Sequence, residues 1–307
     1  MTGATPQPQL RRATAADSEA CFRLFWDSIS DLAARNGTPW EGTADDRWPG
    51  FRALYALLAE IAAEWWVAEV GSDGRLIGYA RSIERGVDHG LFELSEFFVR
   101  PGHQSAGVGR ALLERAFPLG RGAVRAIVAT GDVRAVARYH RADTSIQFPI
   151  LGLNGTPSPD AAADLRLAPE PITDPGDLEE VADIERTVLG YDRGRHELEW
   201  LLDRREAYRY RDAGHTVAFA FIGPDGTGPI AALQPEHLPD VLRHVEARAG
   251  AIGREEVGFE VPAPNVVAIR HLLGRGFRLD PFVTDLMANR PFGQFDRYLG
   301  FTPPFVL

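Results

Sequence analysis

The two halves of this 307-residue chain run through a similar series of predicted strands and helices. Over residues 9–152, the hydrophobic pattern predicts a strand, two helices and three strands, then a helix, a strand, a helix and a last strand. Much of this order returns after residue 165, with an opening strand and helix, a hairpin over residues 216–234 and a closing helix before Gly276. A repeat of this length predicts two copies of one α/β fold, each a mixed sheet with helices on its faces.

The segment LNGTPSPDAAADL, at residues 153–165, concentrates Gly, Pro, Asn, Ser and Asp, as linkers do. We therefore expect one domain over residues 1–152, a linker over residues 153–164 and a second domain over residues 165–307.

The composition is typical of a globular protein in a reducing compartment. A lone cysteine, Cys21, excludes an intramolecular disulfide, and the first residues lack the apolar core of a secretion signal. No run reaches the roughly 18 apolar residues of a membrane span. The net charge of −10 argues against a broad basic surface for nucleic acid. We expect a cytoplasmic protein that binds neither nucleic acid nor membrane.

The stretch FFVRPGHQSAGVGRALL, at residues 97–113, joins a predicted strand to a predicted helix through a loop of small residues. Gly107 and Gly109 let the main chain approach a ligand closely, and loop amides at the positive end of a helix favour an anion such as a diphosphate. The Lys and Ser or Thr of a P-loop do not follow Gly109, and Leu112 stands where a dinucleotide fingerprint needs its third glycine. Both nucleotide-binding classes are therefore disfavoured.

The same stretch resembles the acyl-CoA binding motif, Q/R-x-x-G-x-G/A, of the GNAT superfamily of N-acyltransferases. Residues 104–109 match the motif, and a Val-x-Pro prefix precedes it at residues 99–101. The resemblance implies, for each copy, a mixed and mostly antiparallel sheet flanked by helices.

A second GNAT pattern, N-x-x-A-x-x-x-Y-x-x-x-G-F, follows on a later helix. Asp132, Ala135 and Tyr139 occupy its first three places, whereas Asp143-Thr144 replaces the final Gly-Phe. The turn after this helix is therefore expected to differ from that of the family.

The second half matches the helical pattern with a different set: Asn265, Ala268, Leu272, Gly276 and Phe277. Leu272 stands where the tyrosine would be. The counterpart of the loop, QPEHLPDVL, has two prolines, two acids and no glycine, so it offers fewer amides and repels phosphate. We expect a degenerate second GNAT-like domain that does not bind CoA.

The resemblance implies an N-acetyltransferase that uses acetyl-CoA as cosubstrate and moves the acetyl group directly to an amine. The acceptor is expected to be a small-molecule amine or a peptide amino terminus. No metal is expected, because the histidines lack metal-ligand spacing. The alternative is a CoA-responsive binding protein that has lost transferase activity, and the sequence leaves open whether the chain forms a homodimer.

The resemblance also assigns site residues. One set is expected to bind acetyl-CoA, through strand backbone along the pantetheine arm and loop amides around the diphosphate: Phe97, Phe98, Val99, Gln104, Ser105, Ala106, Gly107, Val108, Gly109, Arg110 and Asp132. A simple helix cap is the competing role for Asp132.

Three further residues are the catalytic candidates. Glu93 or Glu96 takes the amine proton or binds the amine, with Glu96 favoured as the residue nearer the aromatic pair, and Tyr139 protonates the leaving thiolate. On a regular strand, Glu93 and Glu96 face opposite sides, unless a bulge intervenes. A solvated strand carboxylate and a core tyrosine are the competing interpretations.

Residues 36–50 are predicted to form a loop, followed by a second helix over residues 51–64. Trp40 and Trp48 of this loop either wall an acceptor pocket or pack helices onto the sheet. Packing is the expected role of Trp65 and Trp66.

Overall fold

The computed structural model describes residues 8–71, 74–86, 90–104, 107–224 and 226–300. The chain divides into two compact units that do not follow one another simply along the sequence. The first unit comprises residues 1–84, 91–127 and 132–145, and the second comprises residues 85–90, 128–131 and 146–307. Each unit is described by itself below.

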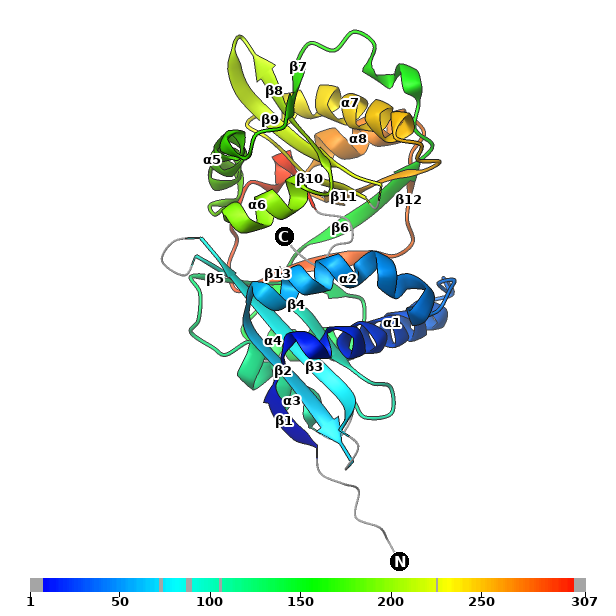
Figure 1. Ribbon diagram of the computed structural model, residues 1–307, viewed down its shortest axis with the longest axis vertical. Helices are drawn as coiled ribbons and strands as arrows, with labels where there is room; N and C mark the ends of the chain where they lie inside the picture. The colour runs from blue at the N-terminus through cyan, green and yellow to red at the C-terminus, as the bar shows by residue number, and fades with distance from the viewer. Residues whose placement is uncertain (1–7, 72–73, 87–89, 105–106, 225, 301–307) are drawn as a thin grey trace, which may run out of the picture. The chain divides into compact units, whose positions relative to one another are not determined.

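The first unit is a twisted sheet with helices on both faces (Figure 1). The strands neighbour one another in the order β1 (Gln9–Arg12), β2 (Ala62–Val70), β3 (Arg75–Arg85), β4 (Leu91–Val99) and β5 (Val124–Thr130). The helices are α1 (Ser18–Arg35), α2 (Ala44–Glu60), α3 (Val108–Ala116) and α4 (Val133–Arg141).

Two neighbouring residues of β3 show which helices cover which face. The Tyr79 hydroxyl lies 3.2 Å from that of Tyr55 on α2. A Cβ atom on Gly78 would lie 3.0 Å from Cδ1 of Leu112 on α3. Because adjacent strand residues point to opposite faces, α2 and α3 cover opposite faces of the sheet.

Strands β4 and β5 run parallel and are in register from Leu91–Val124 to Leu94–Ile127. Beyond Leu94, the described residues of these strands make no further pairs. The last five residues of β4 therefore leave β5, and the ladder hydrogen-bonding groups on that edge are open to another partner.

Helix α2 begins earlier than the sequence pattern indicates. Thr43 accepts a hydrogen bond from the Asp46 amide at 3.3 Å, while the Asp46 carboxylate accepts from the Thr43 amide at 2.9 Å. This capping box starts the helix at Ala44, so the second half of the predicted loop is helical and the prediction was wrong there. Pro49 lies inside this helix.

The second unit contains two groups of strands. In one, β6 (Ser145–Gly155) lies between β13 (Thr284–Ala288) and β11 (Val257–Pro262), and β12 (Arg278–Leu279) also pairs with β6. The other is a five-stranded sheet in the order β14 (Tyr298–Leu299), β10 (Thr227–Ala232), β9 (His215–Ile222), β8 (Glu206–Asp212) and β7 (Ala168–Ile172). The helices are α5 (Leu178–Leu189), α6 (Arg195–Leu202), α7 (Leu238–Ala251) and α8 (Val266–Gly274).

Strand β6 continues into the segment that the sequence predicts as a linker. Leu153 pairs with Phe259 of β11 and Gly155 with Val257. Leu153 is completely buried in the core of the second unit. The domain boundaries stay a prediction, but the start of the predicted linker is strand.

No helix within the described ranges combines the length and apolar character that crossing a membrane requires.

Candidate active site

The loop between β4 and α3 needs its two glycines for different reasons. Gly107 has a φ of +79°, in the left-handed region that disfavours a side chain. Gly109 lies in the first turn of α3, where a Cβ atom would come within 3.1 Å of Cζ of Phe97. Gly107 therefore turns the chain into the helix, and Gly109 lets the helix approach β4.

The same loop leads into the backbone donors of the first turn of α3. The first amides of a helix have no acceptor within the helix and carry its positive dipole end, so those of Val108, Gly109 and Arg110 suit an anion. The side-chain Nε2 of Gln104 donates to the Val99 carbonyl at 3.1 Å, which braces the loop against the end of β4. Ser105 and Ala106, predicted to bind the diphosphate, lie outside the described residues.

The charge beside the loop comes from a residue that the sequence analysis did not select. The Arg110 side chain is 79% exposed and pairs with Glu114 at 2.7 Å, one turn further along α3. Arg138 of α4 instead reaches the loop, where its Nη2 donates to the Gln104 carbonyl at 3.4 Å. The available signal was its position, directly before Tyr139 on the helix that carries the second motif.

The aromatic pair of β4 points to both faces of the sheet. Phe97 lies on the α4 side, with its ring centroid 6.0 Å from that of Tyr139 in an edge arrangement. Phe98 lies on the α1 side, 5.2 Å from Phe25 and 5.7 Å from Tyr79 between centroids. Both predicted residues thus border the open end of β4.

Glu96 lies within a closed hydrogen-bonded network. Its Oε1 accepts from the Tyr55 hydroxyl at 2.6 Å and from the Tyr79 hydroxyl at 2.7 Å. Its Oε2 lies 3.3 Å from Nε of Arg81, and the side chains of both ionic partners are fully buried. Burial, followed by the charge of Glu96, raises the pKa of both tyrosines, so they remain proton donors at neutral pH.

Arg81 is held by aromatic rings as well as by Glu96. Its guanidinium carbon lies 4.1 Å from the centroid of Trp65 and 5.4 Å from that of Tyr55. The described residues provide no hydrogen-bond acceptor for its Nη atoms. Among the described residues, Glu96 is the carboxylate that balances this buried cation, and Trp65 packs as expected.

Glu93 and Glu96 face the same side of the sheet. Phe92 stacks on Phe117 at the end of α3, and Phe97 lies beside the first turn of that helix. A regular strand would point residues five positions apart to opposite faces, so β4 is irregular between them. Since the pairing with β5 is regular as far as residue 94, the irregularity follows Glu93. Both glutamates then face away from α3, and both are buried.

Tyr139 is buried on α4 beside Phe97. Burial, with a smaller contribution from the negative charge of Asp132, raises its pKa, so the hydroxyl keeps its proton at neutral pH. A general acid requires this protonation state.

Asp132 acts as the cap of α4. Its Oδ1 accepts from the Arg134 amide at 2.9 Å, and its Oδ2 lies 2.7 Å from Nη2 of Arg134 and 3.6 Å from Nη2 of Arg35. The arginine hydrogen bond lowers its pKa most, which keeps the carboxylate ionised. These contacts fit the competing interpretation of Asp132 as a helix cap.

The turn after α4 has the left-handed backbone conformation that the turn after α8 adopts with a glycine. Asp143 has a φ of +63°, the left-handed conformation for which the motif uses glycine, and aspartate tolerates it better than most residues. Thr144 closes the helix by donating from its hydroxyl to the Tyr139 carbonyl at 2.9 Å. Gly276 has a φ of +90° after the corresponding helix α8.

The counterpart of the loop in the second unit is filled from within the chain. Asp240, in the first turn of α7, accepts from the amides of Arg166 at 2.8 Å and Leu167 at 3.1 Å. It also pairs with Arg243 at 2.6 Å. Asn265 caps α8, because its Oδ1 accepts from the Ala268 amide at 3.0 Å. The first residue of the helical pattern therefore has a structural role here that requires no ligand.

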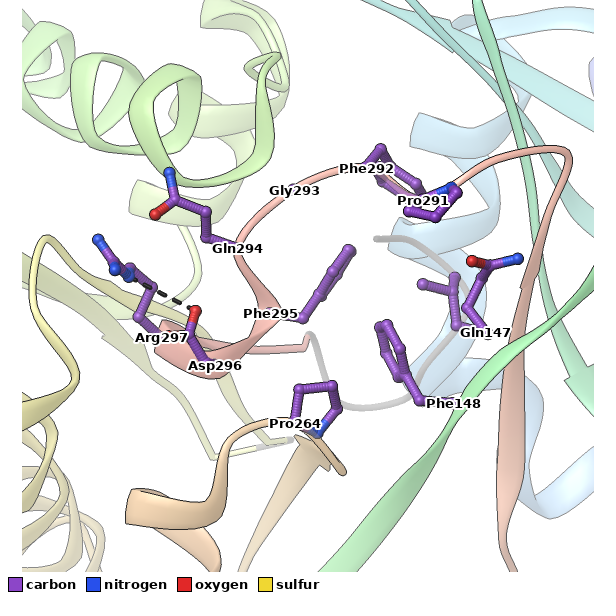
Figure 2. Close-up of a pocket in the computed structure, with 11 residues that line it drawn as sticks. Gln147, Phe148, Pro264, Pro291, Phe292, Gly293, Gln294, Phe295, Asp296 and Arg297 are labelled. Carbon is purple, nitrogen blue, oxygen red and sulfur yellow. Dashed lines mark ion pairs between the residues drawn. The ribbon is translucent and has the colours of Figure 1, made fainter.

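A cavity of about 530 Å³ opens elsewhere in the second unit (Figure 2). Phe148 and Phe295 line it with their ring centroids 5.0 Å apart, and Gln147, Pro264 and Gln294 are among the other lining residues. It contains none of the predicted site residues, and no motif in the sequence pointed to it.

No group of three or more His, Cys, Asp or Glu side chains that could hold a metal ion occurs in the part of the chain that the structure describes.

Comparison with known proteins supports the resemblance of the first unit to the GNAT superfamily. Residues 26–143 match the acetyltransferase (GNAT) family. No curated protein matches the chain.

Solved structures share the fold of nearly the whole chain. A putative acetyltransferase from Pyrococcus horikoshii is 15% identical with a TM-score of 0.72, over 97% of this chain and 95% of that one. A GCN5-related N-acetyltransferase from Sphaerobacter thermophilus is 15% identical with a TM-score of 0.63, over 94% and 98%. A tandem GNAT protein from the clavulanic acid biosynthesis pathway is 17% identical with a TM-score of 0.52, over 93% and 99%. Residues 26–143 therefore match the GNAT family of acetyltransferases, and nearly the whole chain shares the two-domain fold of a tandem GNAT protein.

Proposed function

We propose that this protein is an acetyl-CoA-dependent N-acetyltransferase whose first domain is active and whose second domain is degenerate. The observation that carries the proposal is the junction of β4 and α3. There, the free edge of a strand leads into a glycine loop that ends in the amides of a helix. An extended pantetheine arm fits the first feature and a diphosphate fits the second.

The proposed reaction is a direct transfer. The acceptor nitrogen attacks the thioester carbonyl carbon, the carbon–sulfur bond breaks, and the acetyl group remains on nitrogen. The thiolate of CoA takes a proton from Tyr139, whose hydroxyl stays protonated in its buried position. A backbone amide of Phe97, Phe98 or Val99 would polarise the carbonyl oxygen.

The amine must lose a proton, and β4 offers two carboxylates for it. Tyr55, Tyr79 and Arg81 surround Glu96, so we propose that Glu96 receives the proton through one of the tyrosine hydroxyls rather than by touching the amine. Glu93 is the alternative acceptor, because it faces the same side of the sheet.

The acceptor is proposed to be a small-molecule amine or a peptide amino terminus. It would approach from the face of β4 that carries Glu96 and Phe98, which is the face covered by α1 and α2. Trp48 of α2 packs on Phe22 and Tyr55, with centroids 5.3 and 5.8 Å apart, so its ring contributes to the wall on that side.

The test is an assay of acetyl-CoA turnover with a panel of amines. The assay measures the release of free thiol. Cys21 is buried and does not interfere with a thiol reagent in the folded protein. Tyr139→Phe is expected to lower kcat by roughly 10²–10⁴-fold with little change in the KM for acetyl-CoA. Tyr208→Phe, in the second unit, is the matched control and is expected to keep full activity.

Binding of CoA by the wild-type protein without any thiol release would favour the alternative function, a CoA-responsive binding protein. The replacement of Gly-Phe by Asp143-Thr144 suggested that alternative. Because Asp143 adopts the conformation of the missing glycine, this replacement is weaker support for the alternative function.

A further inference from the structure

We infer that Arg138 supplies the cation that binds the diphosphate of CoA at the start of α3, an inference that rests on the proposed function. Arg138 belongs to α4, not to the glycine loop, and no residue of the acyl-CoA motif takes this role.

The position of the guanidinium is defined by two contacts. Nη2 lies 3.4 Å from the carbonyl oxygen of Gln104, in the loop. Nε lies 3.5 Å from the place where a Cβ atom on Gly109 would be. The guanidinium therefore lies over the first turn of α3, and the glycine makes room for it.

The charge of this group has no counter-charge among the described residues. Within the described ranges, Arg138 pairs with no carboxylate. Its neighbours on the surface do: Arg134 pairs with Asp132, Arg110 with Glu114, and Arg100 with Asp27.

Two positive centres thus lie together, the guanidinium and the amino-terminal end of α3. Arg138 is half-buried, which removes part of the water that would otherwise screen it. Such an arrangement is unfavourable until an anion joins it, and a diphosphate brings several oxygen acceptors for a guanidinium fork and for the helix amides.

A structural role explains little of this placement. The hydrogen bond to the Gln104 carbonyl is long, and a bond of that length contributes little to stability. Replacing Arg138 should therefore leave the fold intact.

The experiment measures CoA binding by calorimetry for the wild type, Arg138→Ala and Arg138→Lys, with Arg115→Ala, an exposed arginine of α3, as the control. Arg138→Ala is expected to weaken CoA binding by about 10–100-fold, Arg138→Lys by less, and Arg115→Ala by less than about twofold. The affinity of Arg138→Ala should also depend less steeply on salt concentration. Melting temperatures of all variants should agree.

Dephospho-CoA, which keeps the diphosphate but lacks the 3′-phosphate, identifies the group that Arg138 contacts. The same loss of affinity with this ligand supports the inference. A loss that occurs with CoA but not with dephospho-CoA assigns Arg138 to the 3′-phosphate and overturns it.

The remaining outcomes separate the inference from the proposed function. If the wild type binds CoA and Arg138→Ala binds it equally well, the inference is wrong and the proposed function stands. If the folded wild type does not bind CoA at all, both are wrong.

Discussion

At the scale of single residues, the first turn of α3 depends on the missing side chain of Gly109. Gly109→Ala would place a methyl group 3.1 Å from Cζ of Phe97 and 3.5 Å from Nε of Arg138. Because the phenyl ring is rigid, we expect the helix to shift from β4, with a loss of about 1–3 kcal/mol in the free energy of unfolding and weaker CoA binding. Chemical denaturation and calorimetry would measure the two effects.

Gly50→Ala provides the control, since Gly50 also lies in a helix but has no atom within 4 Å of the added methyl group. This variant should be stabilised by up to about 1 kcal/mol. Equal stability changes in the two variants would show that helix propensity, and not the contact with Phe97, decides the result.

A second residue-scale prediction concerns Glu260 of β11. Burial, together with the charge of Asp280, raises its pKa to about 7, whereas an unfolded glutamate titrates near ~4.3. Between these values the folded protein holds a proton that the unfolded chain has released, so stability is highest below the lower value and falls as the pH rises through 7. The loss is at most about 4 kcal/mol.

Glu260→Gln should remove this part of the pH dependence. Melting temperatures between pH 5 and pH 8 would fall for the wild type and for Glu256→Gln, an exposed neighbour on the same segment, but stay flatter for Glu260→Gln. Parallel curves for all three proteins would show that Glu260 titrates normally in the fold.

At the scale of elements, the ion pair of Glu96 and Arg81 joins β4 to β3, and Tyr55 adds α2. Glu96→Gln leaves the Arg81 cation buried without a counter-charge, and removal of one partner of such a pair typically costs about 3–5 kcal/mol. The double variant Glu96→Gln with Arg81→Met removes both charges, so we expect it to be more stable than Glu96→Gln alone.

Urea unfolding of the two single variants and the double variant would give the free energies of unfolding for this double-mutant cycle. A double variant whose loss equals the sum of the single losses would show that the two groups do not interact. The activity of Glu96→Gln must therefore be interpreted together with its stability, because loss of the fold and loss of a proton acceptor both lower turnover.

Sequence reasoning located most elements of the first unit and the loop of its candidate site. The helix of α3 and the strand of β4 follow from hydrophobic periodicity, and the need for Gly107 and Gly109 follows from the loop between them. The start of α2 was missed because residues 36–50 were predicted to form a loop, whereas the capping box at Thr43 starts the helix at Ala44.

The contacts of the site were harder to predict than its position. The enclosure of Glu96 depends on Tyr55 and Arg81, which are 41 and 15 positions away in sequence and carry no motif. Arg138 lies within a recognised helical pattern, but its direction toward the loop depends on how α4 packs against α3. Spacing along a chain does not encode such packing.

At the scale of the whole molecule, β6 was predicted as the last strand of the first half, but it pairs with strands of the second half. Strand β6 lies between β13 and β11, whose residues follow it by about 100 positions or more. A fragment of residues 1–155 would retain β6 without either partner and expose two strand edges.

We expect this fragment to aggregate, and residues 1–145, which lack nearly all of β6, to be more soluble. Size-exclusion chromatography at a series of concentrations would compare the two fragments with the full chain. A monomeric and soluble 1–155 fragment would show that β6 is stable without β11 and β13.

The late pairing of β6 also has a consequence for biosynthesis. A ribosome adding about 5–20 residues per second needs roughly 5–20 seconds to proceed from the end of β6 to the start of β11. During that interval the nascent chain carries an apolar strand with no partner, a segment that a chaperone can hold. Production of this protein should therefore be sensitive to translation speed and chaperone supply.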